Sequence, residues 1–116
     1  MKKVINIGGV DVAFRASAAT TFKYRQKFGR DMMKDMARIS ELSDEKGKST
    51  MEYSGEALDT FFHLAYTMAA QANPNIPDDP DEWLDSFDVF PIDAVFPAIA
   101  DLWRTTMQTV DQLKKA

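Results

Sequence analysis

The sequence predicts an α+β fold that is predominantly α-helical, in which a short N-terminal β-hairpin packs on a bundle of about five helices. Two observations carry this prediction. In residues 3–14, apolar and polar side chains alternate with the period of a strand around Gly8 and Gly9, which supply the positive φ angles of a tight hairpin turn. In residues 54–72, apolar side chains recur every three to four positions, which is the period of a helix.

The hairpin at residues 3–14 must rest on other parts of the chain, because a lone two-stranded ribbon is only marginally stable in water. Its second strand carries Val10, Val12 and Phe14 at alternate positions. Successive side chains of a strand point to opposite faces, so these three share one face. We expect that face to lie against the helices.

Two helices joined by a tight break follow the hairpin. The first is expected to end at Gly29, since glycine adopts the left-handed conformation just past a helix end without steric cost. Asp31 suits the N-cap of a second helix over about residues 32–42, because its carboxylate accepts hydrogen bonds from free N–H groups of the first turn.

Helix signals also cover the second half of the chain. The helix at 54–72 is expected to be central, because its apolar stripe is unbroken. Asp79 and Pro80 predict the N-cap and first residue of a short helix, with Glu82 in the place of the capping-box acid. A last helix is expected to start near Pro91.

A single domain is expected over residues 1–116, because this length suits one ordinary domain and is too short for two. Within it, the helical body covers residues 17–110, and the tail at 111–116 is expected to be frayed. The chain has no cysteine, which excludes disulfides and thiolate metal sites. Its apolar runs are too short for a signal peptide or a membrane span, so neither secretion nor membrane association is expected.

The net charge of −4 is divided unequally along the chain. Residues 1–50 contain eleven Lys and Arg against six Asp and Glu, whereas residues 51–116 contain three against twelve. Separated charge of this kind suits steering toward a charged partner or self-association between copies. It is equally typical of two solvated faces that simply differ in charge.

Residues able to perform catalysis or bind metal are few. His63 is the only histidine, and the chain offers neither a cysteine nor a second histidine to act with it. A helix-surface histidine that pairs with Asp59, one turn earlier, is the simpler interpretation. The acids around Asp79 fit helix capping, and their spacing does not match a calcium-binding loop. We therefore expect no enzyme, no cofactor and no metal.

Basic side chains concentrate on both sides of Gly29. Two helices joined at a glycine are also similar to a helix-turn-helix, so a small helical DNA-binding regulator is an alternative function. Against it, Asp31 and Asp35 interrupt the basic stretch, and the chain as a whole is acidic. DNA-binding domains are usually basic.

Tyr24, Arg25, Phe28, Gly29, Arg30 and Asp31 together resemble the Y-R-x-x-F-G-x-D stretch of small tail assembly chaperones from long-tailed bacteriophages. The resemblance begins at I-N-I-G-G-V-D-V-A-F-R-A-S-A-A-T and continues through Y-R-Q-K-F-G-R-D-M-M-K-D-M. It includes L-A-Y-T-M-A-A-Q-A-N-P-N-I-P-D-D-P-D-E-W-L-D-S-F and the final, proline-containing helix. It spans most of the chain, and the order and spacing of these segments carry it.

The resemblance implies a non-enzymatic protein of the host cell cytoplasm that is absent from the mature virion. Members of the family bind the tape-measure protein, keep it soluble and help to recruit tail-tube subunits. Many also exist in a longer frameshifted form that contacts the tail-tube protein. The resemblance thus implies these two protein partners. From the acidic composition and the short apolar runs we expect neither nucleic acid nor membrane as a partner. A structural tail-completion or adaptor protein, retained in the particle, is a further alternative.

A candidate partner-binding site follows from the surface pattern, since the family offers no site residues to transfer. Methionine side chains repack readily against varied surfaces, and three of them lie among basic residues at the start of the second helix. The predicted site consists of Arg30, Met32, Met33, Lys34, Met36 and Arg38.

Overall fold

The computed structural model describes residues 1–43 and 55–115, with side chains described at 1–37 and 55–106. In this part of the chain, an antiparallel hairpin packs on five helices, so the predicted α+β, mostly helical fold is confirmed. The elements in chain order are β1 (Lys2–Ile7), β2 (Val10–Arg15), α1 (Thr20–Phe28), α2 (Met32–Ser43), α3 (Gly55–Ala72), α4 (Pro80–Asp85) and α5 (Ile92–Lys115).

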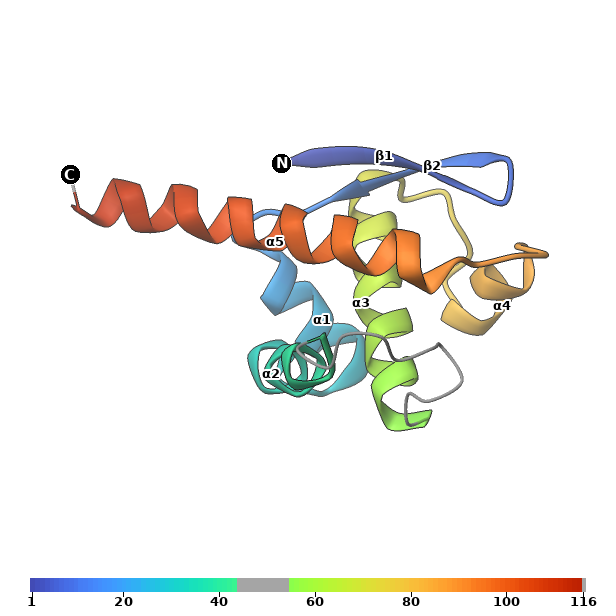
Figure 1. Cartoon of the computed structure of the whole chain (residues 1–116), viewed down its shortest axis with the longest axis horizontal. Helices are drawn as coiled ribbons and strands as arrows, with labels where there is room; N and C mark the ends of the chain where they lie inside the picture. The colour runs from blue at the N-terminus through green and yellow to red at the C-terminus, as the bar shows by residue number, and fades with distance from the viewer. Residues whose placement is uncertain (44–54, 116) are drawn as a thin grey trace.

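Helix α3 occupies the centre of the molecule, as its unbroken apolar stripe predicts (Figure 1). The hairpin lies across one end of α3, and the long helix α5 crosses beside it. Helices α1 and α2 lie on one side of α3, whereas α4 lies on the other. Because every other helix and the hairpin surround α3, its side chains are buried nearly all the way round.

The hairpin turns at Gly8 and Gly9, whose φ angles of 58° and 92° confirm the predicted two-glycine turn. Phe14 is fully buried and Val12 is half-buried, but Val10 is 53% exposed. The prediction that all three face the helices is therefore wrong for Val10. Ile7, the cross-strand partner of Val10, is fully buried, so the core at the turn end of the hairpin covers the β1 residue of this pair and leaves the β2 residue exposed.

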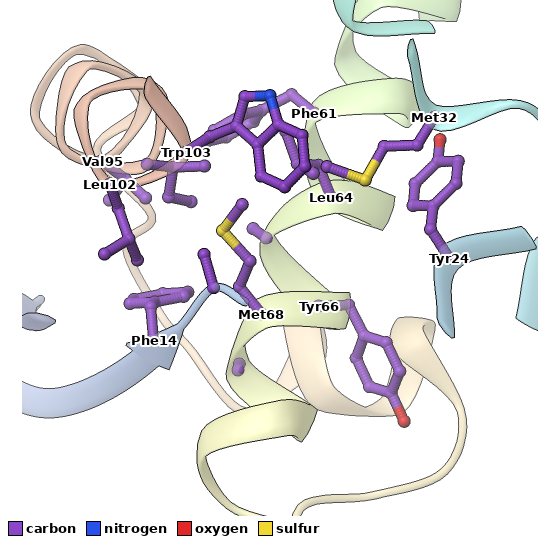
Figure 2. Packing of buried hydrophobic residues seen from close by; sticks show 14 of the residues in the cluster. Phe14, Tyr24, Met32, Phe61, Leu64, Tyr66, Met68, Val95, Leu102 and Trp103 are labelled. Carbon is purple, nitrogen blue, oxygen red and sulfur yellow. The ribbon is translucent and has the colours of Figure 1, made fainter. Parts of the chain in front are cut away.

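The core forms where β2, α3 and α5 meet. Figure 2 shows Phe14 of β2 and the α5 side chains Val95, Leu102 and Trp103 gathered around Met68 of α3. These residues come from three elements that are far apart in the sequence. Each element contributes one apolar face, and burial of these faces is the main stabilising contribution to the fold.

The start of α1 is fixed to the end of α3 by buried polar groups. The hydroxyl of Thr20 donates to Oε1 of Gln71 at 2.8 Å, and Nε2 of Gln71 donates to the hydroxyl of Ser17 at 2.6 Å. The backbone N–H of Ser17 in turn donates to the hydroxyl of Thr20 at 2.9 Å. Thr20 is fully buried, so these bonds satisfy polar atoms that water cannot reach.

Helix α4 begins with the N-cap and the proline that the sequence predicts, but within the described residues Glu82 does not accept the hydrogen bond from the Asp79 backbone N–H that a full capping box would have. Asp79 is its N-cap, and Oδ1 of Asp79 accepts a hydrogen bond from the backbone N–H of Asp81 at 3.0 Å. Pro80 occupies the first helical turn, where a missing N–H costs nothing. The helix orients Trp83, which is buried in the core.

Helix α5 contains Pro97 and continues to Lys115. The sequence analysis ended the helical body at residue 110 and expected a frayed tail at 111–116. The helix instead extends five residues further, through 115. No glycine or second proline follows Pro97 in the chain, so no residue there ends the helix by its backbone preference.

Candidate partner-binding surface

The predicted site lies where α1 turns into α2. Gly29 has φ 66° and ψ 24°, and its N–H donates to the carbonyl oxygen of Arg25 at 2.8 Å, so it is the predicted left-handed cap of α1. Oδ1 of Asp31 accepts from the N–H groups of Met33 at 2.9 Å and Lys34 at 3.3 Å, as expected of an N-cap. Three residues thus join the two helices, with both ends capped.

A buried carboxylate on α2 holds this corner together. The side chain of Asp35 is only 4% exposed. Its Oδ2 accepts hydrogen bonds from the Tyr24 hydroxyl at 2.8 Å and from Nε of Arg30 at 2.8 Å, and its Oδ1 accepts from Nη2 of Arg30 at 2.9 Å. The guanidinium of Arg30 therefore binds the carboxylate with two parallel bonds, which is the strongest geometry for this pair.

The protonation of Tyr24 and Arg30 follows from this arrangement. Burial raises the pKa of the Tyr24 hydroxyl above its ordinary value, and its hydrogen bond to Asp35 raises that pKa further. The hydrogen bonds to Asp35 raise the pKa of Arg30. Tyr24 is thus a neutral donor and Arg30 a permanent cation, so the corner keeps its hydrogen bonds across the physiological pH range.

The structure separates the six predicted site residues. Met32 is only 2% exposed and belongs to the hydrophobic core, so its assignment to a binding surface is wrong. Figure 2 shows its side chain directed toward Leu64 of α3. Met36 is half-buried and packs against the same core. The reason is helical spacing, because residues four apart lie on the same face of a helix and that face of α2 meets α3.

Met33 and Lys34 remain available to a partner. Met33 is 51% exposed, and Lys34 is exposed beside it in the first turn of α2. Arg30 is half-exposed, but its guanidinium is bound to Asp35. The side chain of Arg38 lies outside the described residues.

Helix α1 adds exposed side chains that the sequence analysis did not assign to the site. Phe22 is a large exposed aromatic residue, and Lys23 and Arg25 are exposed near it in sequence. Helical periodicity could have indicated these residues, because Thr20 and Tyr24 form the buried face of α1 and the other faces are left to solvent. We call the exposed residues Phe22, Lys23, Arg25, Met33 and Lys34 the α1–α2 surface.

The C-terminal end of α1 is anchored on α3 by ring stacking. The ring of Phe28 stacks on the imidazole of His63 with centroids 4.1 Å apart and an interplanar angle of 17°. The ring of Phe28 also lies 5.2 Å, centroid to centroid, from the ring of Tyr24 one helical turn earlier, so these two motif aromatics support each other. The motif residues Tyr24 and Phe28 therefore position the α1–α2 surface, and they do not form part of it.

The pKa of His63 is lower than the ordinary histidine value. Burial lowers its pKa, and the charge of Arg30 lowers it further. The charges of Asp59 and Asp35 act in the opposite direction, but they do not outweigh burial. His63 is therefore a neutral, half-buried ring packed on Phe28, whereas the sequence analysis expected a histidine on the helix surface that pairs with Asp59.

Neither a metal site nor a membrane span is found in the part of the chain that the structure describes. No group of three or more His, Asp or Glu residues is placed there to hold a metal ion. None of the described helices is both long enough and apolar enough to cross a bilayer.

Comparison of the chain with protein-family models, with curated proteins and with solved structures gives no match.

Proposed function

We propose that this protein is a tail assembly chaperone of a long-tailed bacteriophage, which binds the tape-measure protein and assists assembly of the tail tube. The observation that carries the proposal is the resemblance of four sequence segments, in order, to that family. The Y-R-x-x-F-G-x-D stretch is among them. In this proposal the protein is non-enzymatic, acts in the host cytoplasm and leaves before the virion is complete. A longer frameshifted form would make the main contacts with the tail-tube protein.

The chemistry of the α1–α2 surface supports this proposal. A chaperone of a long filament has to bind at many places, so each contact must tolerate different sequences. Flexible apolar groups such as Met33 adapt to varied partners, and the neighbouring Lys34 adds electrostatic attraction. Capping at Gly29 and Asp31 presents both residues on a fixed helix end.

The direct test is co-expression of the tape-measure protein with and without this chain. We expect its soluble fraction to rise severalfold when the chain is present, because exposed apolar surface of the tape-measure protein is then covered. An unchanged soluble fraction contradicts the proposed function.

Two substitutions test the site. Met33→Gln and Lys34→Glu both change exposed side chains and leave the Arg30–Asp35 pair intact, so we expect each to reduce the soluble fraction without lowering the stability of the chaperone itself. Lys2→Glu is the matched control, because it makes the same charge change on an exposed hairpin residue. Equal effects of Lys2→Glu and Lys34→Glu would mean that net charge matters and that the α1–α2 surface does not.

Two further measurements separate the alternative functions. Mass spectrometry of purified virions distinguishes a chaperone, which is absent, from a structural tail-completion or adaptor protein, which is retained. Titration with duplex DNA at two salt concentrations tests the regulator. A DNA-binding protein loses affinity steeply as salt rises, whereas we expect no binding at either concentration.

A further inference from the structure

The hairpin has a free strand edge with a defined set of hydrogen-bonding groups. Met1 and Ala16 exchange both backbone hydrogen bonds, at 2.9 and 3.0 Å, which extends the pairing of β1 with β2 by one residue pair. Hydrogen-bonded and non-hydrogen-bonded pairs alternate along an antiparallel ladder. The pairs Lys2–Arg15, Val4–Ala13 and Asn6–Asp11 are therefore non-hydrogen-bonded pairs.

In such pairs the backbone N–H and C=O groups point away from the partner strand. On β2 these residues are Asp11, Ala13 and Arg15, and no hydrogen bond within the described residues satisfies their outward groups. An edge of this kind accepts another strand, because every outward group is a ready donor or acceptor.

The side chains of the β2 edge are complementary to themselves. If a second β2 lies antiparallel to the first with Ala13 opposite Ala13, Asp11 of each copy faces Arg15 of the other. Both side chains are exposed, and Asp11 uses only its Oδ1 in the described contacts, to accept from Nδ2 of Asn6 at 3.0 Å. Opposite charges at directly facing positions stabilise a strand pair.

The outer edge of β1 lacks this complementarity. The same symmetric pairing there places Val4 opposite Val4 and Lys2 opposite Asn6. No pair of opposite charges results, and Lys3 already pairs with Asp101 of α5 at 3.8 Å. Charge complementarity therefore favours the β2 edge.

We propose that two copies of this chain associate by antiparallel pairing of their β2 strands around a two-fold axis at Ala13. The product is a continuous four-stranded sheet in the order β1-β2-β2-β1, closed by two Asp11–Arg15 ion pairs. Only three residues of each strand take part, so the dimer is weak and exchanges rapidly. This inference does not depend on the proposed chaperone function.

A proline at the edge tests the pairing. The N–H of Ala13 is not used within the hairpin, so Ala13→Pro removes an intermolecular donor and keeps the internal ladder. Val4→Pro makes the same change at the β1 edge and serves as the matched control. In sedimentation velocity over a micromolar-to-millimolar concentration series, we expect wild type and Val4→Pro to dimerise and Ala13→Pro to stay monomeric. Circular dichroism verifies that both variants are folded.

A charge swap tests the register. Asp11→Arg places arginine opposite arginine at both ends of the pair, so we expect dimerisation to weaken by about tenfold or more. The double variant Asp11→Arg/Arg15→Asp restores opposite charges across the axis and should restore dimerisation. The double variant cannot restore the hydrogen bond from Asn6 to Asp11 within one chain. Recovery of dimerisation would therefore come from the restored charge pairs between the two copies. A monomeric wild type, an equal loss in Val4→Pro, or no rescue by the double variant overturns the proposal.

Discussion

The carboxylate of Asp35 fixes the relative position of α1 and α2, because it accepts hydrogen bonds from Tyr24 on α1 and from Arg30 in the connecting turn. Removing one partner of a buried ion pair is strongly destabilising, since a charge then remains buried without compensation. Arg30 is 46% exposed, so water screens part of this interaction and the cost here is smaller. Arg30 thus belongs to the support of the α1–α2 surface.

His63 makes the stability of the protein depend on pH. Its folded-state pKa lies below the ordinary histidine value of about 6.5, mainly because the ring is buried against Phe28. The unfolded state therefore binds the proton more tightly, and the stabilisation is complete above pH 6.5 and lost as the pH falls toward the folded-state pKa. The charged groups that act on the ring are Asp59 of α3, Arg30 of the turn and Asp35 of α2.

We expect the free energy of unfolding to decrease between about pH 7 and pH 5.5, a window above the titration of ordinary carboxylates near pH 4. Urea unfolding at steps of pH measures it, and His63→Gln serves as the control because its stability should be flat in this window. A stability that increases on acidification in the wild type would show that attraction to Asp59 outweighs burial.

At the scale of elements, the ends of helices are set by single residues. Gly29 ends α1 in the left-handed conformation, and a Cβ atom placed there meets no atom within 4 Å. The cost of a substitution is therefore entirely one of backbone conformation. Asp31 and Asp79 begin α2 and α4 by accepting N–H groups of the first turn.

Gly29→Val should destabilise the protein by roughly 1 kcal/mol or more, because a β-branched residue is strained at this positive φ. Gly29→Asn should cost less, since asparagine tolerates the left-handed region. Gly55→Ala is the control, because Gly55 also has open space around it but lacks a positive φ, and we expect it to be neutral or mildly stabilising. Midpoints of urea unfolding compare the three variants. Equal midpoints for Val and Asn at position 29 contradict the conformational account.

At the scale of the whole molecule, the hairpin closes the core that α3 and α5 leave open at one end (Figure 2). Its aromatic contribution is Phe14, which is fully buried, whereas Val10 on the same strand is 53% exposed. Two apolar residues of one strand therefore differ in their effect on stability, because only one of them meets the helices.

Phe14→Ala should cost about 3–5 kcal/mol through lost burial and the cavity that remains. This is a large part of the 5–15 kcal/mol that typically stabilises a domain, so thermal unfolding should occur at a markedly lower temperature. Val10→Ala is the matched control, and we expect it to stay within about 0.5 kcal/mol of the wild type. Similar losses in both variants would mean that strand propensity dominates and packing does not.

The amino-acid sequence by itself determined the local features of this protein. The two-glycine turn, the end of α1 at Gly29 and the caps at Asp31 and Asp79 all depend on residues within three or four positions of one another. Helical periodicity also identified α3 as the central helix. Such features are predictable because their physical causes, backbone strain and the satisfaction of nearby N–H groups, lie within the same short segment.

Only the tertiary structure decided which side chains of the candidate site are available. Met32 and Met33 are neighbours in sequence and chemically identical, yet one is in the core and the other in solvent, because α3 covers one face of α2. Asp35 looked like an interruption of a basic stretch, and its burial among Tyr24 and Arg30 became visible only in the folded corner. The stack of Phe28 on His63 likewise joins residues 35 positions apart. Burial depends on what packs against a residue, and that partner is set by distant parts of the chain.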